Sequence, residues 1–276
     1  MTGEKVVLHG AQETLLITLC ATAGESHLPD SLLKDRFAAR ALAQIDYDFD
    51  RLKIDRDMMI GIALRAHVID GWTCDFLGAH PEATVLHLGC GLDSRVFRIA
   101  PSANVRWFDV DYPDVIALRQ RLYPAREGCT LLPSSVTEPD WLDAVPQDRQ
   151  AFVIAEGLLP YLPAEEVVLL LERVTNHLPG GELAFDAYSR LGLTLIAWQP
   201  SVRATGAKLH WSLDDPDELL RQFPDLELVE ELLGYGSGGY DPAQVARMSL
   251  VARVVVPVMG MIPALSRIGG LLRFRF

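Results

Sequence analysis

The sequence predicts an α/β protein with a doubly wound, mostly parallel sheet, and three observations support this prediction. Strand-like and helix-like segments alternate from Thr84 onward, as they do in repeated strand–helix–strand units. An apolar strand over residues 85–88 leads directly into a glycine turn, formed by Gly89 and Gly91, that opens a helix. A second strand over residues 105–109 follows, with acidic residues at its end. We expect a ligand at this edge of the sheet, where the strands end.

The remaining elements follow from hydrophobic periodicity and from the breaks in it. Before residue 84, apolar residues at three- and four-residue spacing predict helices over 13–20, 30–43 and 57–77, with no strand between them. Further strands are predicted over 130–132, 152–155, 182–186, 226–233 and 249–256, and a helix over 163–177. Residues 189–225 interrupt the alternation and are predicted to form a lid. We therefore expect a single domain over 1–276, with a helical cap over 1–83, a core over 84–256 and a tail over 257–276.

Composition and charge exclude several classes of protein. A formal net charge of −12 without a basic face argues against a nucleic-acid partner. Arg253, Pro257 and Pro263 interrupt the apolar stretch near the C-terminus, so no membrane partner is expected. Four scattered cysteines and the absence of an apolar leader after Met1 indicate a cytoplasmic protein. Seven histidines without ligand spacing predict no metal site, and a homo-oligomer stays open.

The glycine turn and the acids after it predict the chemistry of the ligand. Gly89 and Gly91 lack a Cβ and can take positive φ, so the backbone can approach a ligand at the start of the next helix. Asp109 or Asp111 lies about 20 residues further on, at the spacing of an acid that accepts hydrogen bonds from both ribose hydroxyls. Both acids lie on the same side of the predicted strand, so the sequence leaves the choice between them open. A nucleoside-containing cofactor is expected.

Ser94 helps to choose among such cofactors. A dinucleotide site usually has a third glycine in a G-x-G-x-x-G pattern, and Ser94 holds that place here. A Gly-x-Gly turn with an acid soon after it fits S-adenosyl-L-methionine, which has no pyrophosphate to bind. The sequence therefore favours S-adenosyl-L-methionine, with a nicotinamide oxidoreductase as the alternative.

Three ordered motifs carry a resemblance to a known family. They are Leu-Gly-Cys-Gly-Leu-Asp-Ser-Arg at 88–95, Trp-Phe-Asp-Val-Asp-Tyr-Pro at 107–113 and Ala-Glu-Gly-Leu-Leu-Pro-Tyr-Leu at 155–162. Together they resemble the leucine carboxyl methyltransferase family, most closely its bacterial branch of tetracenomycin-type polyketide O-methyltransferases. The resemblance covers nearly the whole chain. It implies a Rossmann-like class I methyltransferase with a seven-stranded sheet, an N-terminal helical extension and a lid insertion.

The resemblance also implies roles for particular residues. Arg65 is similar to a helical arginine that binds the carboxylate of the cofactor, a task that suits a guanidinium. The other expected cofactor-binding residues are Gly89, Gly91, Asp109, Asp111, Ser135, Val136 and Glu156. Ser135 and Val136 stand where a related branch has an acid near the adenine amine, so a serine hydroxyl or a backbone carbonyl replaces that acid. Tyr161 closes the third motif and is a candidate for the methyl-transfer pocket.

The acceptor is expected to be a carboxylate of a small aromatic or polyketide-type molecule. A carboxylate with a pKa of about 4 is ionised at neutral pH and needs no general base, and the sequence shows no persuasive acid–base pair. If a base is used, the candidates are His67, His210 and Glu156, and His210 joins Tyr161 as a catalytic candidate. The predicted lid supplies the candidate substrate residues Tyr188, Trp198, Arg203 and Trp211. Phenol methylation and a repurposed cofactor-binding cyclase remain alternatives.

Overall fold

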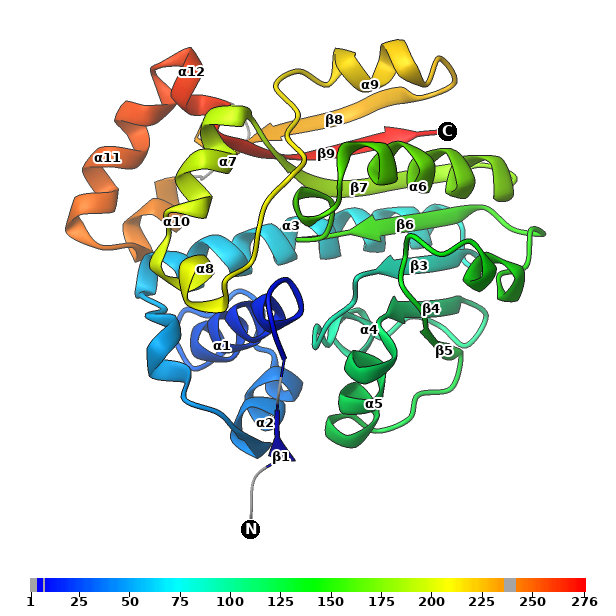
Figure 1. The fold of residues 1–276 in the computed structure, drawn as a ribbon, viewed down its shortest axis with the longest axis horizontal. Helices are drawn as coiled ribbons and strands as arrows, with labels where there is room; N and C mark the ends of the chain where they lie inside the picture. Colours follow the sequence, from blue (N-terminus) through cyan, green and yellow to red (C-terminus); the bar gives the residue numbers. More distant parts are fainter. Residues whose placement is uncertain (1–3, 7, 236–241) are drawn as a thin grey trace.

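A mixed seven-stranded sheet forms the centre of the molecule (Figure 1). The computed structural model describes residues 4–6, 8–235 and 242–276. Along the sheet the strand order is β5-β4-β3-β6-β7-β9-β8. The first five strands in this order are parallel, and β9 runs antiparallel to both β7 and β8. The strands are β3 (Thr84–Leu88), β4 (Arg106–Asp111), β5 (Cys129–Pro133), β6 (Ala151–Ala155), β7 (Gly181–Tyr188), β8 (Glu227–Leu233) and β9 (Gly269–Arg275).

Alternation along the central strands divides the core into two layers. All five residues of β3 are buried. Val85 packs with Trp107 on one face of the sheet, whereas Leu86 and Leu88 pack with Phe108 on the other. This is the pattern of a strand that is covered on both faces. The apolar run at residues 85–88 therefore lies in the middle of the sheet, as its sequence indicates.

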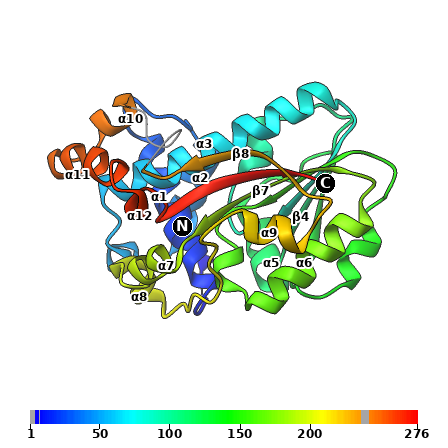
Figure 2. The same ribbon diagram turned by 90° about the horizontal axis from the view of Figure 1, so that it is seen from above.

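Helices cover both faces of the sheet (Figure 2). The long helix α3 (Arg56–Ala79) and the short α4 (Arg95–Ile99) pack on one face, with Ile69 and Phe76 of α3 in the core layer. Helices α6 (Ala164–His177) and α9 (Asp217–Gln222) pack on the other face. Helix α5 (Pro113–Leu122) joins β4 to β5.

A group of smaller elements gathers at the carboxyl ends of the parallel strands (Figure 1). Helices α1, α7, α8 and α11 of this group each contribute residues to one large cavity. The group consists of α1 (Leu15–Ser26), α2 (Arg36–Gln44), α7 (Arg190–Ala197), α8 (Pro200–Thr205), α10 (Pro242–Arg247), α11 (Leu250–Gly260) and α12 (Pro263–Ser266). Short 3₁₀ turns are η1 (Gln12–Thr14), η2 (Phe49–Leu52), η3 (Asp140–Ala144) and η4 (Leu159–Tyr161).

The structure confirms the predicted α/β class and corrects the N-terminal elements in detail. Two short strands, β1 (Glu4–Lys5) and β2 (Ile45–Asp46), pair in parallel within the region that was expected to be purely helical. Helix α2 begins at Arg36, later than predicted, because the Asp35 carboxylate caps it by accepting hydrogen bonds from two backbone N–H groups of its first turn.

The strand predicted over 249–256 is wrong, because these residues belong to helix α11. The run is rich in valine, which favours strands, and its apolar residues are contiguous. A local and a long-range contact favour the helix. The Ser249 hydroxyl caps it by accepting from the Ala252 N–H at 3.2 Å, and Ser249 itself donates to the carboxylate of the distant Asp57 at 2.6 and 2.7 Å. The remaining strand of the sheet is β9, inside the segment that was expected to be a tail.

Candidate functional site

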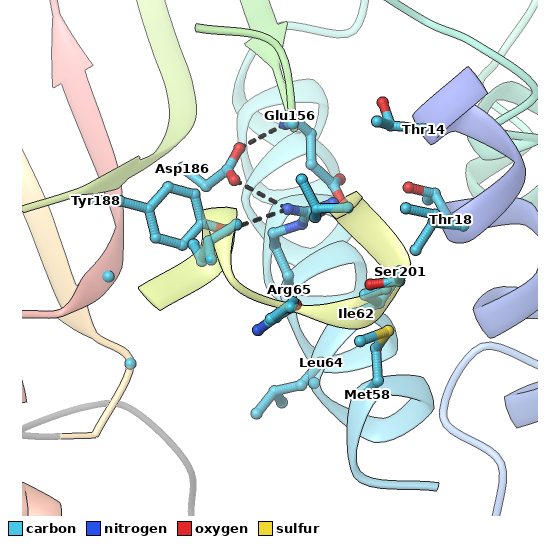
Figure 3. A pocket seen from close by; sticks show the side chains of 18 of the residues that line it. Thr14, Thr18, Met58, Ile62, Leu64, Arg65, Glu156, Asp186, Tyr188 and Ser201 are labelled. Atoms are coloured by element: carbon cyan, nitrogen blue, oxygen red, sulfur yellow. Dashed lines mark hydrogen bonds and ion pairs between the residues drawn. The ribbon is translucent and has the colours of Figure 1, made fainter. Parts of the chain in front are cut away.

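A cavity of about 810 Å³ opens where the parallel strands end. Charged and hydroxyl-bearing side chains reach it from the strand ends and from the middle of α3 (Figure 3). Its apolar lining comes from the start of α3, from α7 and from α11. This apolar lining includes Met58, Ile62, Leu195, Ile196, Val251, Val255 and Met259. One side of the cavity is therefore polar and the other is apolar, as is typical of a small-molecule site.

The glycine turn after β3 forms part of the polar wall. Gly89 and Gly91 have φ values of +61° and +49°, a region that L side chains rarely adopt. A Cβ at Gly89 would lie 2.9 Å from Leu158 Cδ1, and one at Gly91 would lie 3.2 Å from Leu15 Cβ. Only glycine allows the chain to turn here while leaving the cavity open. Both glycines line the cavity, as the sequence predicts.

The structure separates the two candidate ribose acids. Asp111 ends β4, lines the cavity and accepts hydrogen bonds from the backbone N–H groups of Gly91 and Tyr112, both at 2.7 Å. Burial raises the pKa of Asp111, and these two hydrogen bonds only partly oppose that effect. Its carboxylate is thus fixed beside the glycine turn.

Asp109 lies outside the cavity lining, which corrects its placement among the cofactor-facing residues. It is completely buried, and its carboxylate accepts from Arg119 Nη2 at 2.6 Å and from Trp107 Nε1 at 2.8 Å. Burial opposes ionisation of Asp109, but the Arg119 guanidinium outweighs burial and lowers the pKa of Asp109 to about 2. Asp109 therefore holds an internal ion pair.

Arg65 lies at the centre of the polar wall. From α3 it donates through Nε to Glu156 Oε1 at 2.8 Å and through Nη1 to Asp186 Oδ2 at 2.9 Å, and Nη1 lies 3.4 Å from the Tyr188 hydroxyl (Figure 3). Burial would lower the pKa of Arg65, but the two carboxylates raise it well above its ordinary value. The guanidinium is permanently charged and held between two acids.

Sequence reasoning missed Asp186. This residue lies near the end of β7, and its carboxylate accepts from the Gly157 N–H at 2.5 Å as well as from Arg65. The neighbouring parallel strand β6 ends just before Glu156, so both acids reach the same edge. The rule that ligands bind at the carboxyl ends of parallel strands would have identified Asp186, since its strand was predicted.

The sequence analysis also missed the buried Arg95, which binds the Glu156 carboxylate. Arg95 is completely buried and donates through Nη2 to Glu156 Oε2 and through Nε to Asp70 Oδ1, the latter at 2.6 Å. Its Nη1 lies 3.3 Å from Asp93 Oδ2 and 3.4 Å from Nε2 of His87, which also lines the cavity. Glu156 is therefore held by two arginines. Arg95 stands inside the first motif, but nothing local to that motif reveals its partners.

Tyr161 and Tyr188, the candidates for the methyl-transfer pocket and for substrate binding, both line the cavity. Burial raises the pKa of each phenol above its ordinary value. Both side chains are therefore neutral at physiological pH and act as hydrogen-bonding groups or as apolar walls rather than as bases.

The structure places the other predicted site residues outside the cavity lining. Ser135 hydrogen-bonds with Thr137 at 2.9 Å, and Val136 is part of the hydrophobic core. Trp211 also belongs to that core, packed against Phe185. These corrections have a common cause, because a serine, a valine or a tryptophan in a loop fits a core as well as a pocket.

Three further candidates from the predicted lid lie at the surface. Trp198 is 71% exposed, and the Arg203 guanidinium lies 5.9 Å above its ring. The His210 side chain is exposed, while its backbone N–H donates to the carbonyl of Pro160. The same segment nevertheless reaches the cavity through Leu195, Ile196 and residues 199–202.

Two features are absent from the described residues, namely a metal-binding cluster and a membrane-spanning helix. No group of three or more histidine, cysteine, aspartate or glutamate side chains within residues 4–6, 8–235 and 242–276 is arranged to hold a metal ion. Across the same ranges, none of the helices combines the length and apolar character needed to span a bilayer.

The polar wall offers complementary groups to the parts of an S-adenosyl-L-methionine molecule. Arg65, Glu156 and Asp186 present one positive and two negative charges side by side, which suits an amino-acid head with both charges. Asp111 offers acceptor oxygens to hydroxyl groups beside a glycine turn that leaves room for a ligand. These residues fit the cofactor.

Comparison with known proteins leads to the same cofactor. Residues 16–175 match the family model of leucine carboxyl methyltransferase. The chain is 46% identical over 230 residues to the tetracenomycin polyketide synthesis O-methyltransferase TcmP of Streptomyces glaucescens, which covers 83% of this chain and 85% of the relative. It is 38% identical over 249 residues to the S-adenosyl-L-methionine-dependent methyltransferase dpfgK of Gibberella zeae, covering 83% and 84%.

A comparison of folds agrees with these relatives. A solved structure from Thermobifida fusca superposes with a TM-score of 0.59 at 18% identity, covering 94% of this chain and 93% of the other. At this level of identity the match shows the fold alone. The comparisons as a whole favour methyl transfer over the nicotinamide oxidoreductase that the sequence left as an alternative.

Proposed function

Because this chain belongs to the leucine carboxyl methyltransferase family and is an S-adenosyl-L-methionine-dependent methyltransferase, we propose that it methylates the carboxylate of a small polyketide-type acid. The observation that carries this proposal is the mismatch between the two sides of the cavity. Every acidic or basic group of the polar wall is held in an ion pair or a backbone hydrogen bond. The acceptor side is mainly apolar, and the Asp55 and Asp57 carboxylates that line it at the start of α3 are hydrogen-bonded within the protein. Such a site positions an acceptor that is already ionised.

We assign the cofactor to the polar wall. Arg65 binds the carboxylate of the amino-acid head, and Glu156 or Asp186 faces its ammonium group. The guanidinium is suited to this role because it bonds Glu156 and Asp186 through Nε and Nη1. Its Nη2 makes no hydrogen bond to any of the described residues and is available to a ligand. Asp111 accepts from the ribose hydroxyls. Gly89 and Gly91 let the backbone approach the cofactor closely.

When bound, the cofactor supplies a methyl group on a sulfonium, which an acceptor lone pair attacks in line. The chain's own contribution is to orient the acceptor and to exclude water. Holding two reactants in the right geometry contributes ~7–11 kcal/mol. A carboxylate has a pKa of about 4, so at neutral pH it presents its lone pair without a proton transfer.

The lack of a suitable general base among the described lining residues favours methylation of a carboxylate over methylation of a phenol. A phenol has a pKa of ~10 and benefits from a general base within hydrogen-bond reach. Among the described residues that line the cavity, His87 is the only histidine, and it is 2% exposed and lies against Arg95 and Asp109. Tyr161 and Tyr188 are neutral. Of the candidate bases from the sequence, His67 and His210 do not line the cavity, and Glu156 is paired with Arg65 and Arg95.

The apolar lining supports a hydrophobic acceptor. Among the described residues, those that α7 and α11 contribute to the lining carry no charge, and the start of α3 adds Met58 and Ile62. The relative from Streptomyces glaucescens is named for tetracenomycin polyketide synthesis, and its 46% identity supports an acceptor of polyketide type. The cavity of about 810 Å³ is large enough for a cofactor beside a fused-ring acid.

A product assay tests the proposal. The purified protein is incubated with S-adenosyl-L-methionine carrying an isotopically labelled methyl group and with paired aromatic acids and phenols. A methyl ester releases labelled methanol in mild base, whereas a methyl ether does not. We expect base-labile product from the acids. Base-stable product would indicate phenol methylation, and cofactor binding with no methylated product from any acceptor would favour a repurposed protein such as a cyclase.

A further inference from the structure

A buried serine hydroxyl faces the cavity without a partner. Ser201 lies in the first turn of α8, is 1% exposed and lines the cavity. Within the described part of the chain its Oγ has no hydrogen-bond partner, although the atom is buried. A buried hydroxyl normally finds a partner, because leaving it unsatisfied costs free energy. An exception in a cavity wall points to a ligand as the missing partner.

The surroundings of Ser201 are apolar. Its neighbour Val202 is buried in a hydrophobic cluster with Ile17 of α1, and Met58 and Ile62 of α3 pack against the same cluster. Figure 3 shows Ser201 in the same part of the cavity as Ile62, Met58 and Thr18. The hydroxyls of Ser201 and Thr18 are therefore polar groups in a mainly apolar region.

Other contacts hold α8 in place. Arg51 Nη2 of η2 donates to the carbonyl of Ala204 at 2.8 Å. The Thr205 hydroxyl, one turn beyond Ser201, donates to the carbonyl of Val202 at 2.8 Å. The Thr205 hydroxyl on the same helix thus has a hydrogen-bond partner within the protein, whereas the Ser201 hydroxyl has none among the described residues. Its orientation into the cavity is fixed by the helix that carries it.

The position along α3 places Ser201 on the acceptor side. Met58 and Ile62 precede Arg65 by seven and three residues, so they lie about 10 and 5 Å along the helix from it. The part of α3 beyond Arg65 packs on the sheet through Ile69, Trp72 and Phe76, so the strand ends, where the cofactor head is assigned, lie toward that side of Arg65. Because Ser201 packs with the Met58 and Ile62 region, its hydroxyl faces the acceptor rather than the cofactor head.

We propose that Ser201 determines substrate specificity by hydrogen-bonding to a ring oxygen of the acceptor, a hydroxyl or carbonyl group distinct from the carboxylate that is methylated. This inference rests on the proposed function. The inference narrows the proposed substrate class to acids whose ring system carries an additional oxygen. Thr18 on α1 offers a second hydroxyl to the same part of the cavity.

A binding comparison tests the proposal. Calorimetry in the presence of S-adenosylhomocysteine measures the affinity for 2-naphthoic acid and for its monohydroxylated isomers. We expect the wild-type protein to prefer at least one hydroxylated isomer by roughly threefold to tenfold, the range of a single hydrogen bond. Ser201→Ala should abolish that preference, and Ser201→Thr, which keeps the hydroxyl, should retain it. Affinity for S-adenosylhomocysteine alone should be the same in all three proteins.

The matched control is Thr205→Val, which removes a hydroxyl that is bonded within the same helix. It should lower the Tm and leave the isomer preference intact, whereas Ser201→Ala should not lower the Tm. The proposal is overturned if Ser201→Ala keeps the preference, weakens S-adenosylhomocysteine binding, or lowers the Tm as Thr205→Val does. Binding of the acids without any isomer preference overturns it as well. If no acid binds while S-adenosylhomocysteine does, the proposed acid substrate is itself wrong.

Discussion

Arg65 and Glu156 meet through a hydrogen bond of 2.8 Å from Nε to Oε1, although they come from a helix before the sheet and from the end of its central strand β6. Each is also held by a further partner: Arg65 by Asp186, and Glu156 by the buried Arg95. The charges that face the cavity are therefore oriented by the protein before a ligand arrives. Such preorganisation reduces the free energy needed to order the site on binding.

Replacing Arg65 with methionine should destabilise the protein strongly. The change leaves the carboxylates of Glu156 and Asp186 buried without their shared cation, and breaking a buried pair in this way costs about 3–5 kcal/mol. Urea denaturation measures the loss. The double variant Arg65→Met with Asp186→Asn should recover part of it, because one uncompensated charge is removed. An unchanged midpoint in the single variant would show that this cluster contributes nothing to folding.

The two acids of β4 should respond differently to amide substitution. Asp111→Asn should weaken S-adenosylhomocysteine binding at least ~10-fold, because an amide loses the charge-assisted bonds to the ribose hydroxyls. Asp109→Asn should mainly lower the Tm, because it disrupts the buried pair with Arg119. Calorimetry and thermal unfolding on both variants check this. The reverse pattern would move the ribose site to Asp109.

Affinity for the cofactor should decrease as the solution is acidified. Because the pKa of Asp111 is raised, this decrease should begin at a higher pH than it would for an aspartate with an ordinary pKa. The ionised form of Asp111 accepts the ribose hydrogen bonds, and burial raises its pKa above the usual ~3.9. As the pH falls through this raised pKa, the carboxylate is protonated and affinity is lost. Titration of S-adenosylhomocysteine affinity between pH 4 and 7 measures the effect. A wild-type curve identical to that of Asp111→Asn would contradict the assignment.

Stability at low pH should depend on Asp109, whose pKa is shifted in the opposite direction from that of Asp111. Its pKa of about 2 in the folded protein lies below the unfolded value of ~3.9, so ionised Asp109 stabilises the fold. The contribution, about 2–3 kcal/mol, is present above pH ~4 and is lost as the pH falls toward 2. Urea denaturation across this range should show a shallower acid dependence for Asp109→Asn. An equally steep loss in that variant would assign the effect to other carboxylates.

Much of the fold was predictable because hydrophobic periodicity reports burial. The run at residues 85–88 indicated a strand covered on both faces, and β3 (Thr84–Leu88) is buried throughout. The valine-rich run near the C-terminus failed for a specific reason. Its conformation depends on Ser249 and Asp57, which are far apart in the sequence, so local propensity could not reveal the helix.

The sequence predicted site residues well where they lie at a strand end. It could not tell which of two acids on the same side of a strand reaches the cavity and which is buried inside the sheet. Asp109 and Asp111 share a side of the predicted strand, but Asp109 stands opposite His87 inside the sheet and Asp111 ends the strand. The end of β4 distinguishes them, and the sequence placed that end at residue 109 rather than at Asp111. The partners of Arg65 were hidden for a similar reason, since Asp186 comes from a strand that follows 121 residues later.

The exposed Trp198 should be dispensable, whereas its neighbour Leu195 should not. Both belong to the α7 segment that was expected to bind substrate, but Leu195 lines the cavity and Trp198 is 71% exposed with its ring against Arg203. Trp198→Ala should leave the KM for an acid substrate within about twofold, because an exposed cation–π contact contributes little. Leu195→Ala removes apolar surface from the acceptor wall and should raise the KM several-fold, since a buried CH₂ is worth about 0.8 kcal/mol. Steady-state kinetics on the two variants measures both KM values. A large increase for Trp198→Ala with a small increase for Leu195→Ala would mean that α7 presents its other face to the substrate.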